Sequence, residues 1–211
     1  YLEEDIENVL LQEQPEGERV QEEGEEYTVA GQPGGYHRRT PEDYDKSLCL
    51  IPDDLIDFIK ATQPKQWRKL KKLEGDEAEE KLLKRVKNRV DKKGTVYVLR
   101  NELKLSGCRF RLTYFRPNTG LNPELQKKYK ANFFSVVRQL KYSQDNENSL
   151  DLGIFLNGLP VFTAELKNPM NGQDVGDAVA QYKHDRDPRE PIFRFKRCLA
   201  HFAVDPQEVY Y

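Results

Sequence analysis

The fold of this chain is decided by the segment Ser149-Leu-Asp-Leu-Gly-Ile-Phe-Leu-Asn-Gly-Leu-Pro-Val-Phe-Thr-Ala-Glu-Leu-Lys-Asn168. It contains two runs of alternating apolar residues, and between them stands Asn157-Gly158, a dipeptide typical of tight β-turns. The segment therefore predicts a β-hairpin.

Alternation along this hairpin separates its residues into two faces, because successive side chains of a strand point to opposite sides. The apolar residues with even numbers are Leu152, Ile154, Leu156, Phe162, Ala164 and Leu166. We expect this even face to lie on the core, and the odd face, with Asp151, Thr163, Glu165 and Lys167, to be exposed. A two-residue loop would pair even with odd numbers, so the buried face favours an odd-length loop with a left-handed bulge at Gly158.

The odd face carries residues that suit metal-dependent phosphoryl chemistry. Asp151 and Glu165 offer hard oxygen ligands at the end of a strand pair, which suit Mg²⁺ or Mn²⁺ rather than zinc. Lys167 follows Glu165 by roughly 6.5 Å along the same face, where an amine can orient water or stabilise phosphorane charge. A charged surface hairpin would explain the same residues without any chemistry.

These residues and their neighbours resemble a known family. Asp151 followed by Glu165-Leu-Lys167 looks like the PD-(D/E)xK nuclease motif. Residues 156–160, 164–168 and 177–182 resemble the N-terminal nuclease domain of the HsdR-type motor subunit of type I restriction enzymes. The resemblance covers residues 95–211 and extends loosely over the N-terminal part.

The resemblance implies an α/β (α+β) fold: a restriction-endonuclease-like core with a mixed central β-sheet flanked by helices, here with a helical insertion. It implies Mg²⁺-dependent (or Mn²⁺-dependent) endonucleolytic cleavage of double-stranded DNA, with Asp151 and Glu165 as metal ligands, Lys167 positioning water, and Gln181 ordering the site or contacting DNA. It also implies ATP use by downstream motor domains only, methylation and specificity subunits as partners, and a cytoplasmic location in a prokaryotic cell.

The N-terminal residues 2–12 have apolar side chains at helical spacing and predict an amphipathic helix. In the resembling family the first helix often places a Glu near the metal, which makes Glu7 the preferred third ligand and Glu3 the second candidate. An acidic surface of this helix is the alternative.

A second functional helix is expected over residues 173–187. The family often has a Tyr four residues after the Gln that matches Gln181, but this chain has Asp185 there. Tyr182 is adjacent to the Gln, so the roles of Tyr182 and Asp185 stay open.

Three basic residues near the end of this helix, Lys183, Arg186 and Arg189, are candidate DNA contacts. Exposed charges at a helix end explain them equally well. We expect His201, within an apolar run, to be a core histidine rather than a ligand.

Elsewhere the pattern predicts helices that begin at Pro52 and Pro123 and a helix over residues 76–92. The expected strands are Thr95–Leu99, Cys108–Phe115, Asn132–Leu140 and Phe193–Asp205, with one more at Glu26–Ala30 in a loop-rich stretch. We predict one domain, composed of an N-terminal helix and loop (1–48), a helical insertion (49–93) and a catalytic core (94–211).

Composition sets further bounds. The 211 residues have a net charge of −2, so no global basic field favours nucleic acid, although basic residues are dense between 65 and 93. The three cysteines have neither disulfide nor zinc spacing, there is no apolar run long enough to span a membrane, and no Walker motif occurs. Because the chain starts without Met, we expect it to be part of a longer protein.

Two rival functions remain. The same core could serve a stand-alone or repair nuclease, or a non-cleaving module that binds DNA or regulates a motor. If Glu165 supplies chemistry from an exposed face, Glu165→Ala should abolish cleavage and leave the fold intact.

Overall fold

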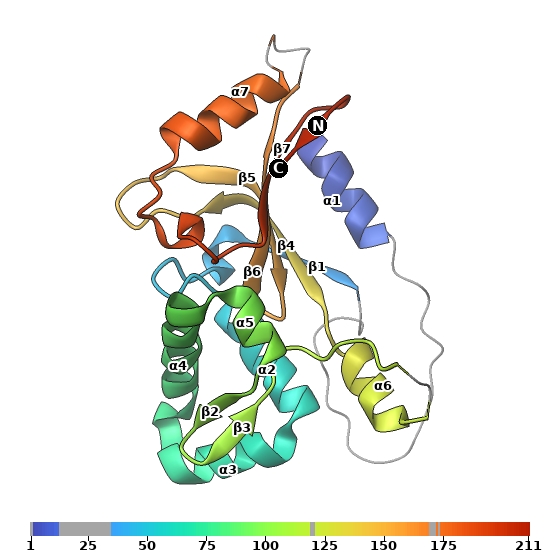
Figure 1. Cartoon of the computed structure of the whole chain (residues 1–211), viewed down its shortest axis with the longest axis vertical. Coiled ribbons are helices and arrows are strands. Elements are labelled where there is room, and N and C mark those ends of the chain that lie inside the picture. The colour runs from blue at the N-terminus through green and yellow to red at the C-terminus, as the bar shows by residue number, and fades with distance from the viewer. Residues whose placement is uncertain (1, 13–34, 119–120, 169–171, 173) are drawn as a thin grey trace.

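The computed structural model describes residues 2–12, 35–118, 121–168, 172 and 174–211 (Figure 1). The strand expected at 26–30 lies outside the described residues. None of the described helices is long and apolar enough to cross a lipid bilayer.

A six-stranded mixed sheet forms the centre of the molecule, in the order β1-β4-β5-β6-β7-β8. Its strands are β1 Tyr36–Arg39, β4 Phe134–Lys141, β5 Ser149–Leu156, β6 Leu159–Leu166, β7 Ala200–Val204 and β8 Val209–Tyr210. The outer pairs β1–β4 and β6–β7 are parallel, whereas the inner pairs β4–β5 and β5–β6 and the edge pair β7–β8 are antiparallel. The expected mixed sheet flanked by helices is thus confirmed.

The central hairpin β5–β6 closes with a two-residue turn, so the predicted odd-length loop is wrong. Asn157 and Gly158 both have positive φ, 48° and 82°, as a turn that matches strand twist requires. Beside the turn Leu156 pairs with Leu159, but a bulge between Ile154 and Phe155 shifts the ladder. Further along, even residues face even ones, which is the register that the sequence predicted.

A second prediction is also wrong: the odd face of the hairpin, expected to be exposed, is buried along β6. On β6 the odd residues Val161, Thr163 and Glu165 are buried, at 1–2% exposure, while Phe162 and Ala164 are only partly buried. The reason is that β6 lies inside the sheet and is covered on both faces. Alternation within one strand cannot reveal what packs over its polar side.

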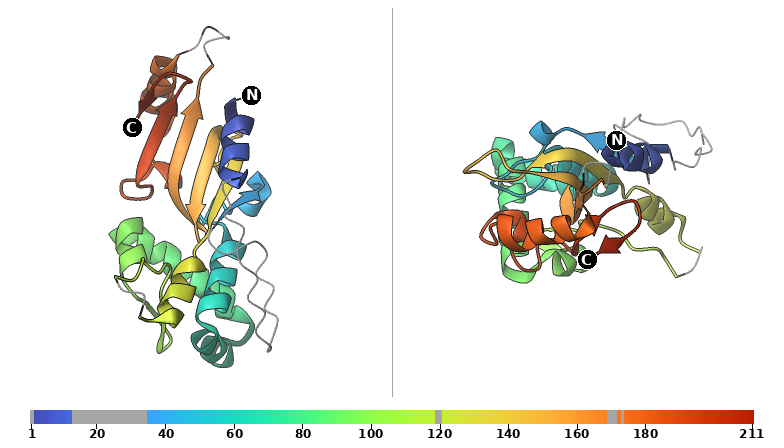
Figure 2. Two further views of the ribbon diagram at one scale, coloured as in Figure 1. Left: turned by 90° about the vertical axis from the view of Figure 1, so that its right-hand side faces the viewer. Right: turned by 90° about the horizontal axis from the view of Figure 1, so that it is seen from above.

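Below the sheet lies a helical lobe that shares one core with the lower ends of β5 and β6 (Figures 1 and 2). Its elements are α2 Pro52–Thr62, α3 Pro64–Glu74, η2 Gly75–Glu77, α4 Ala78–Lys93, α5 Thr95–Arg100, β2 Leu103–Leu105 and β3 Cys108–Phe110. The start of α2 is fixed to the hairpin turn, because Ile51 N donates to Gly158 O at 2.9 Å. A Cβ on Gly158 would lie 2.4 Å from Ile51 O, so only glycine allows this close approach.

The predicted strand Thr95–Leu99 is wrong, because these residues form helix α5. Thr95, Val98 and Leu99 are its buried residues, at the spacing of one helical face. A short apolar run is ambiguous between strand and helix, and packing against α4 decides it here. The adjacent prediction Cys108–Phe115 is confirmed only for β3.

Several other predictions are confirmed within a few residues: the helices at 2–12, from Pro52, at 76–92 and from Pro123, and the strand near 132–140. The remaining elements are α1 Leu2–Gln12, η1 Pro41–Asp43, α6 Pro123–Lys130, α7 Val175–Ala180, η4 Gln181–Asp185 and η5 Pro191–Phe193. In Figures 1 and 2, α1 lies beside β1 and β4, and α7 lies beside β6 and β7. The last predicted strand is shorter than expected, since only 200–204 of 193–205 form β7.

A buried ion pair joins α2 to the sheet. Asp54, fully buried, accepts from Arg39 Nε at 2.9 Å and from the Ser135 hydroxyl. Burial raises the pKa of Asp54, while Ser135 and Arg39 act to lower it. Asp54, in the first turn of α2, is therefore a structural residue.

Candidate active site

The hairpin register brings two carboxylates together at the upper ends of β5 and β6. Leu152 pairs with Ala164, which places Asp151 opposite Glu165. Asp151 Oδ2 accepts from the backbone N–H of Leu166 at 2.7 Å, a bond that fixes the side chain toward β6. The structure thus brings Asp151 and Glu165 to one spot, as the sequence predicted.

Glu165 is buried, with 1% exposure, and its Oε1 accepts a charge-assisted bond from Arg186 Nη2. The Arg186 side chain is itself only 7% exposed. Its other Nη donates to the Tyr142 hydroxyl at 3.1 Å, and the guanidinium lies 5.5 Å from the centre of the Tyr142 ring. Arg186 is therefore held against Glu165 and Tyr142 rather than presented to solvent, which differs from the surface DNA contact considered from the sequence.

Burial raises the pKa of Glu165 to about 7. Arg186 and Lys167 lower this pKa, whereas the nearby Asp151 carboxylate raises it. Two acids at close range in a buried place disfavour a second negative charge. A cation at this position would relieve that cost.

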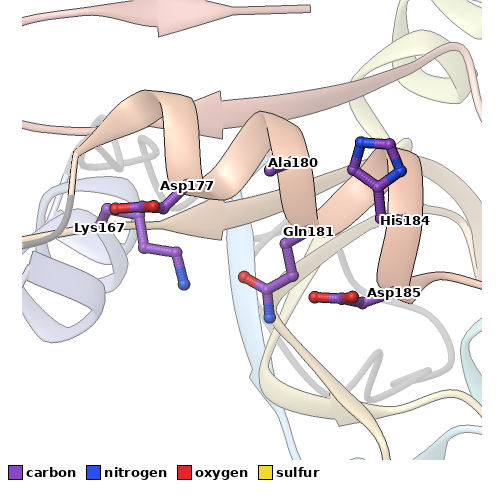
Figure 3. A pocket seen from close by; sticks show the side chains of 6 residues that line it. All are labelled: Lys167, Asp177, Ala180, Gln181, His184 and Asp185. Carbon is purple, nitrogen blue, oxygen red and sulfur yellow. The ribbon is translucent and has the colours of Figure 1, made fainter.

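Lys167 and Gln181 lie on either side of a cavity of about 430 Å³ between the end of β6 and α7–η4. In Figure 3 their side chains extend to the same side of the helix, with Asp185 beside the Gln181 amide, whereas the His184 ring points away. Gln181 Oε1 is buried and accepts no hydrogen bond from any described residue. Lys167 itself is fixed through its backbone N–H, which donates to Val204 O at 2.8 Å.

The predicted helix over 173–187 changes type at the site. The α-helix α7 ends at Ala180, and Gln181–Asp185 form the π-helix η4. A π turn closes hydrogen bonds from residue i to residue i+5 rather than i+4, and such turns are frequent at functional sites. Arg186, which bonds Glu165, follows directly after this turn, and nothing in the sequence pattern signals the change of helix type.

Tyr182 faces the sheet. Its hydroxyl lies 2.9 Å from Thr163 Oγ1, which also bonds His201 Nδ1 at 2.6 Å. Burial raises the pKa of Tyr182 and lowers that of His201. His201 is thus a hydrogen-bonded histidine within the sheet layer, as expected, and Tyr182 is part of the packing below Glu165.

The N-terminal helix reaches the site through Glu3 rather than Glu7. Glu7 is 2% exposed, and its carboxylate binds Arg38 at 2.9 Å and Arg138 at 3.4 Å. Gln139 Nε2 contacts both Glu3 oxygens at 3.0 Å and lies 3.3 Å from Asp151 Oδ1.

Gln139 is a functional candidate that the sequence analysis missed. Its backbone has a φ of 48°, uncommon for a residue that is not glycine. The left-handed conformation interrupts the β4–β5 ladder between Arg138 and Leu140, opposite Asp151. The sequence contains no signal for this irregularity.

The two remaining DNA-contact candidates stand at the surface. Lys183 is exposed on η4. Arg189, with 89% side-chain exposure, forms an ion pair with Asp187 at 2.7 Å. Neither lies against the carboxylates in any described contact.

The donor set allows one type of metal site. Within the part of the chain that the structure describes, no group of three or more His, Cys, Asp or Glu side chains is arranged to hold a metal ion. Asp151 and Glu165 offer two carboxylates at one place, which fit an ion that keeps several water ligands. Mg²⁺ is such an ion, commonly bound by one or two carboxylates together with substrate phosphates.

The mixed sheet, its surrounding helices and the acidic pair at the end of its central hairpin define an α+β restriction-endonuclease-like fold. Residues 56–211 match the model of a family described as the type I restriction enzyme R protein N terminus. The match covers most of the chain, so the chain belongs to this family. The match begins within α2, so Glu3 and Glu7 lie before it. Comparison with curated proteins and with solved structures found no match.

Proposed function

We propose that this chain is the nuclease domain of a type I restriction enzyme R subunit and hydrolyses phosphodiester bonds of double-stranded DNA with Mg²⁺ or Mn²⁺. The observation that carries the proposal is the meeting of Asp151 and Glu165 beside Lys167, which lines the same cavity as Gln181. The family supports the restriction system, and the site chemistry supports the reaction.

Hydrolysis forms a bond between water oxygen and phosphorus and breaks the bond to a deoxyribose oxygen. A bound Mg²⁺ ion would polarise a phosphoryl oxygen and acidify its coordinated water. Asp151 and Glu165 would hold the ion, and Asp151 is fixed by Leu166 N–H for this purpose. Lys167 would stabilise the negative charge that develops on phosphorus-bound oxygens.

The finer parts of the proposal follow the family. We propose a single nuclease domain within a longer polypeptide whose motor domains use ATP to translocate DNA, in the prokaryotic cytoplasm. Its partners would be double-stranded DNA and the methylation and specificity subunits. The family match supports these partners through the restriction enzyme in which this N terminus occurs.

The Arg186–Glu165 ion pair supports a second candidate, a DNA-binding or motor-regulating domain that does not cleave. In that case the guanidinium would be a permanent counter-charge for Glu165. The two candidates differ in whether a divalent ion displaces Arg186.

A cleavage assay on plasmid DNA with the natural chain and its partner subunits separates them, and the variant Lys167→Ala tests the proposed chemistry. Because both carboxylates remain, the variant should bind Mn²⁺ as the natural chain does but lose at least about a hundredfold in cleavage rate. Lys72→Ala, which removes an exposed amine on α3, is the matched control and should cleave normally. Equal cleavage by Lys167→Ala and the natural chain would refute the proposed role of Lys167, and no cleavage by the natural chain with its partner subunits would favour the second candidate.

A further inference from the structure

A second cavity, of about 800 Å³, lies between α5 and the segment that leads into β7. Figure 1 shows α5 directly beneath that segment. We call it the aromatic pocket, after the residues that characterise its lining: Lys93, Tyr97, Arg100, Phe195, Lys196 and Leu199.

The apolar part of this lining is unusually exposed. Phe195 is 90% exposed, Leu199 47% and Val96 44%. Single exposed apolar residues are common, but several that line one concave surface mark a binding site.

The charged part of the lining has one sign. Lys93, Arg100 and Lys196 contribute three positive charges, and no Asp or Glu is present among the described lining residues. The acids closest in sequence pair with other cations: Asp91 binds Lys87 and Arg197, and Glu102 binds Arg109 and Arg111. In a chain whose net charge is −2, this local concentration favours an anionic ligand.

Cations and aromatic rings are interleaved in the pocket. Arg89 lies 5.0 Å and Lys93 5.8 Å from the Tyr97 ring centre, and Lys196 lies 5.1 Å from that of Phe195. Aromatic platforms within a basic groove are how proteins bind unpaired nucleic acid, because bases stack on the rings while cations contact phosphates.

The two walls of the pocket are joined by backbone bonds, so its shape is formed in advance. Thr95 N donates to Lys196 O at 2.9 Å, and a Cβ on Gly94 would lie 2.6 Å from Lys196 Cβ. Lys196 has a φ of 69°, a conformation that a lysine rarely adopts. This strained residue places Phe195 and its own side chain at the mouth of the pocket.

The aromatic pocket lies on the same face of the sheet as Glu165. His201, in its lining, bonds Thr163, which precedes Glu165 by two residues on β6. Leu199 N donates to Val161 O, four residues before Glu165, or about 13 Å along the strand. That is about four steps of a DNA helix with a rise of about 3.4 Å per base pair.

We propose that the aromatic pocket binds unpaired nucleotides of a DNA strand beside the cleavage site, with a base on Phe195 and phosphates on Lys93, Arg100 and Lys196. The assignment rests on the DNA-cleaving function proposed above. It adds a preference for a single strand, such as an overhang or a locally opened duplex.

The test measures binding by fluorescence anisotropy in EDTA, so that cleavage plays no part. The probes are a labelled single-stranded oligothymidine, a blunt duplex, and the same duplex with an oligothymidine overhang. The variants are Phe195→Ala and Lys196→Gly, the latter because glycine accepts the positive φ. Phe115→Ala and Lys72→Ala are controls, since Phe115 is 61% exposed outside the pocket and Lys72 is exposed on α3.

We expect Phe195→Ala to weaken oligothymidine binding at least about fivefold, from the value of one base–aromatic stack. Lys196→Gly should reduce the slope of log affinity against log salt by about 0.7. Both pocket variants should bind the blunt duplex as the natural chain does. The control variants Phe115→Ala and Lys72→Ala should bind oligothymidine with unchanged affinity.

The inference would be overturned if both pocket variants bound oligothymidine as the natural chain does, or if the natural chain did not bind it. If the variants kept their DNA affinity but lost binding to other subunits, the pocket would belong to a protein partner instead. The cleavage proposal fails separately. Pocket-dependent oligothymidine binding by a chain that never cleaves would retain this inference while refuting the nuclease mechanism.

Discussion

Asp54 and Glu165 are both buried carboxylates that an arginine binds, yet their hydrogen-bond partners and surroundings differ. Arg39 binds Asp54 through both Nε and Nη2, and Ser135 binds the second Asp54 oxygen. At Glu165 the guanidinium of Arg186 approaches with one Nη, and its Nε has no described partner.

The surroundings differ as well. Glu165 has a second carboxylate, Asp151, close enough to raise its pKa, whereas the groups that act on Asp54, apart from burial, all lower its pKa. The Asp54 pair thus satisfies both carboxylate oxygens, whereas the Glu165 pair retains a like charge and an unpaired arginine nitrogen nearby. Perturbed acids of the second kind mark candidate active sites.

The largest expected difference is in activity. Glu165→Gln preserves side-chain shape and should reduce DNA cleavage by about a thousandfold, because a metal-binding charge is lost. Asp54→Asn should cleave normally per folded molecule while unfolding at a lower temperature. Plasmid cleavage and thermal unfolding followed by circular dichroism measure both effects, and normal cleavage by Glu165→Gln would remove that carboxylate from the mechanism.

The substitution Glu165→Ala, which the sequence suggested as neutral for folding, is unsuitable. Glu165 is buried and paired, so truncation would leave the Arg186 charge buried alone. Removing one partner of a buried pair costs about 3–5 kcal/mol.

Removal of the arginines gives the next largest effect. Arg186→Met and Arg39→Met should each lower the free energy of unfolding by about 3–5 kcal/mol, because each leaves a buried carboxylate unpaired. Added Mn²⁺ should restore stability to Arg186→Met, since the ion replaces the lost cation, but not to Arg39→Met. Urea unfolding with and without Mn²⁺ measures this. If Mn²⁺ changed the stability of both variants equally, the proposed difference between the Glu165 and Asp54 ion pairs would be contradicted.

The smallest effect is the pH dependence of metal binding. Folded Glu165 retains its proton up to about pH 7, whereas the unfolded chain loses it near 4.5. Folding therefore binds a proton between these values, and the stability from this group is present below about pH 4.5 and lost as the pH rises to about 7. Metal competes with that proton, so Mn²⁺ affinity should fall about tenfold per unit below pH 7.

Calorimetric titrations at about pH 6 and about pH 8 would measure this dependence. Asp54→Asn should retain it, because Asp54 does not bind the ion. A metal affinity independent of pH over this range would contradict the raised pKa of Glu165.

The sequence predicted the hairpin, its even register and the meeting of Asp151 with Glu165, because these depend on local alternation. It failed to predict that Thr163 and Glu165 are buried, because their burial depends on α7, η4 and Arg186, which pack over β6. It also failed for Thr95–Leu99, where Thr95, Val98 and Leu99 pack as one helical face. Local preference yields to such tertiary contacts.

Arg186 and Gln139 show a different limit. Each reaches the site through an irregularity of the backbone, a π turn before Arg186 and a positive φ at Gln139. Such features arise from the balance of the whole fold, and no residue spacing indicates them.

The central claim is that Asp151 and Glu165 bind a divalent metal, and calorimetric titration of Mn²⁺ tests it most directly. The natural chain and Asp151→Asn would be titrated at about pH 8, where Glu165 is ionised, with and without duplex DNA. We predict saturable binding by the natural chain and at least about tenfold weaker binding by Asp151→Asn, whose amide oxygen still accepts from Leu166 N–H. Equal affinity in both, or no binding by the natural chain even with DNA present, would contradict the claim.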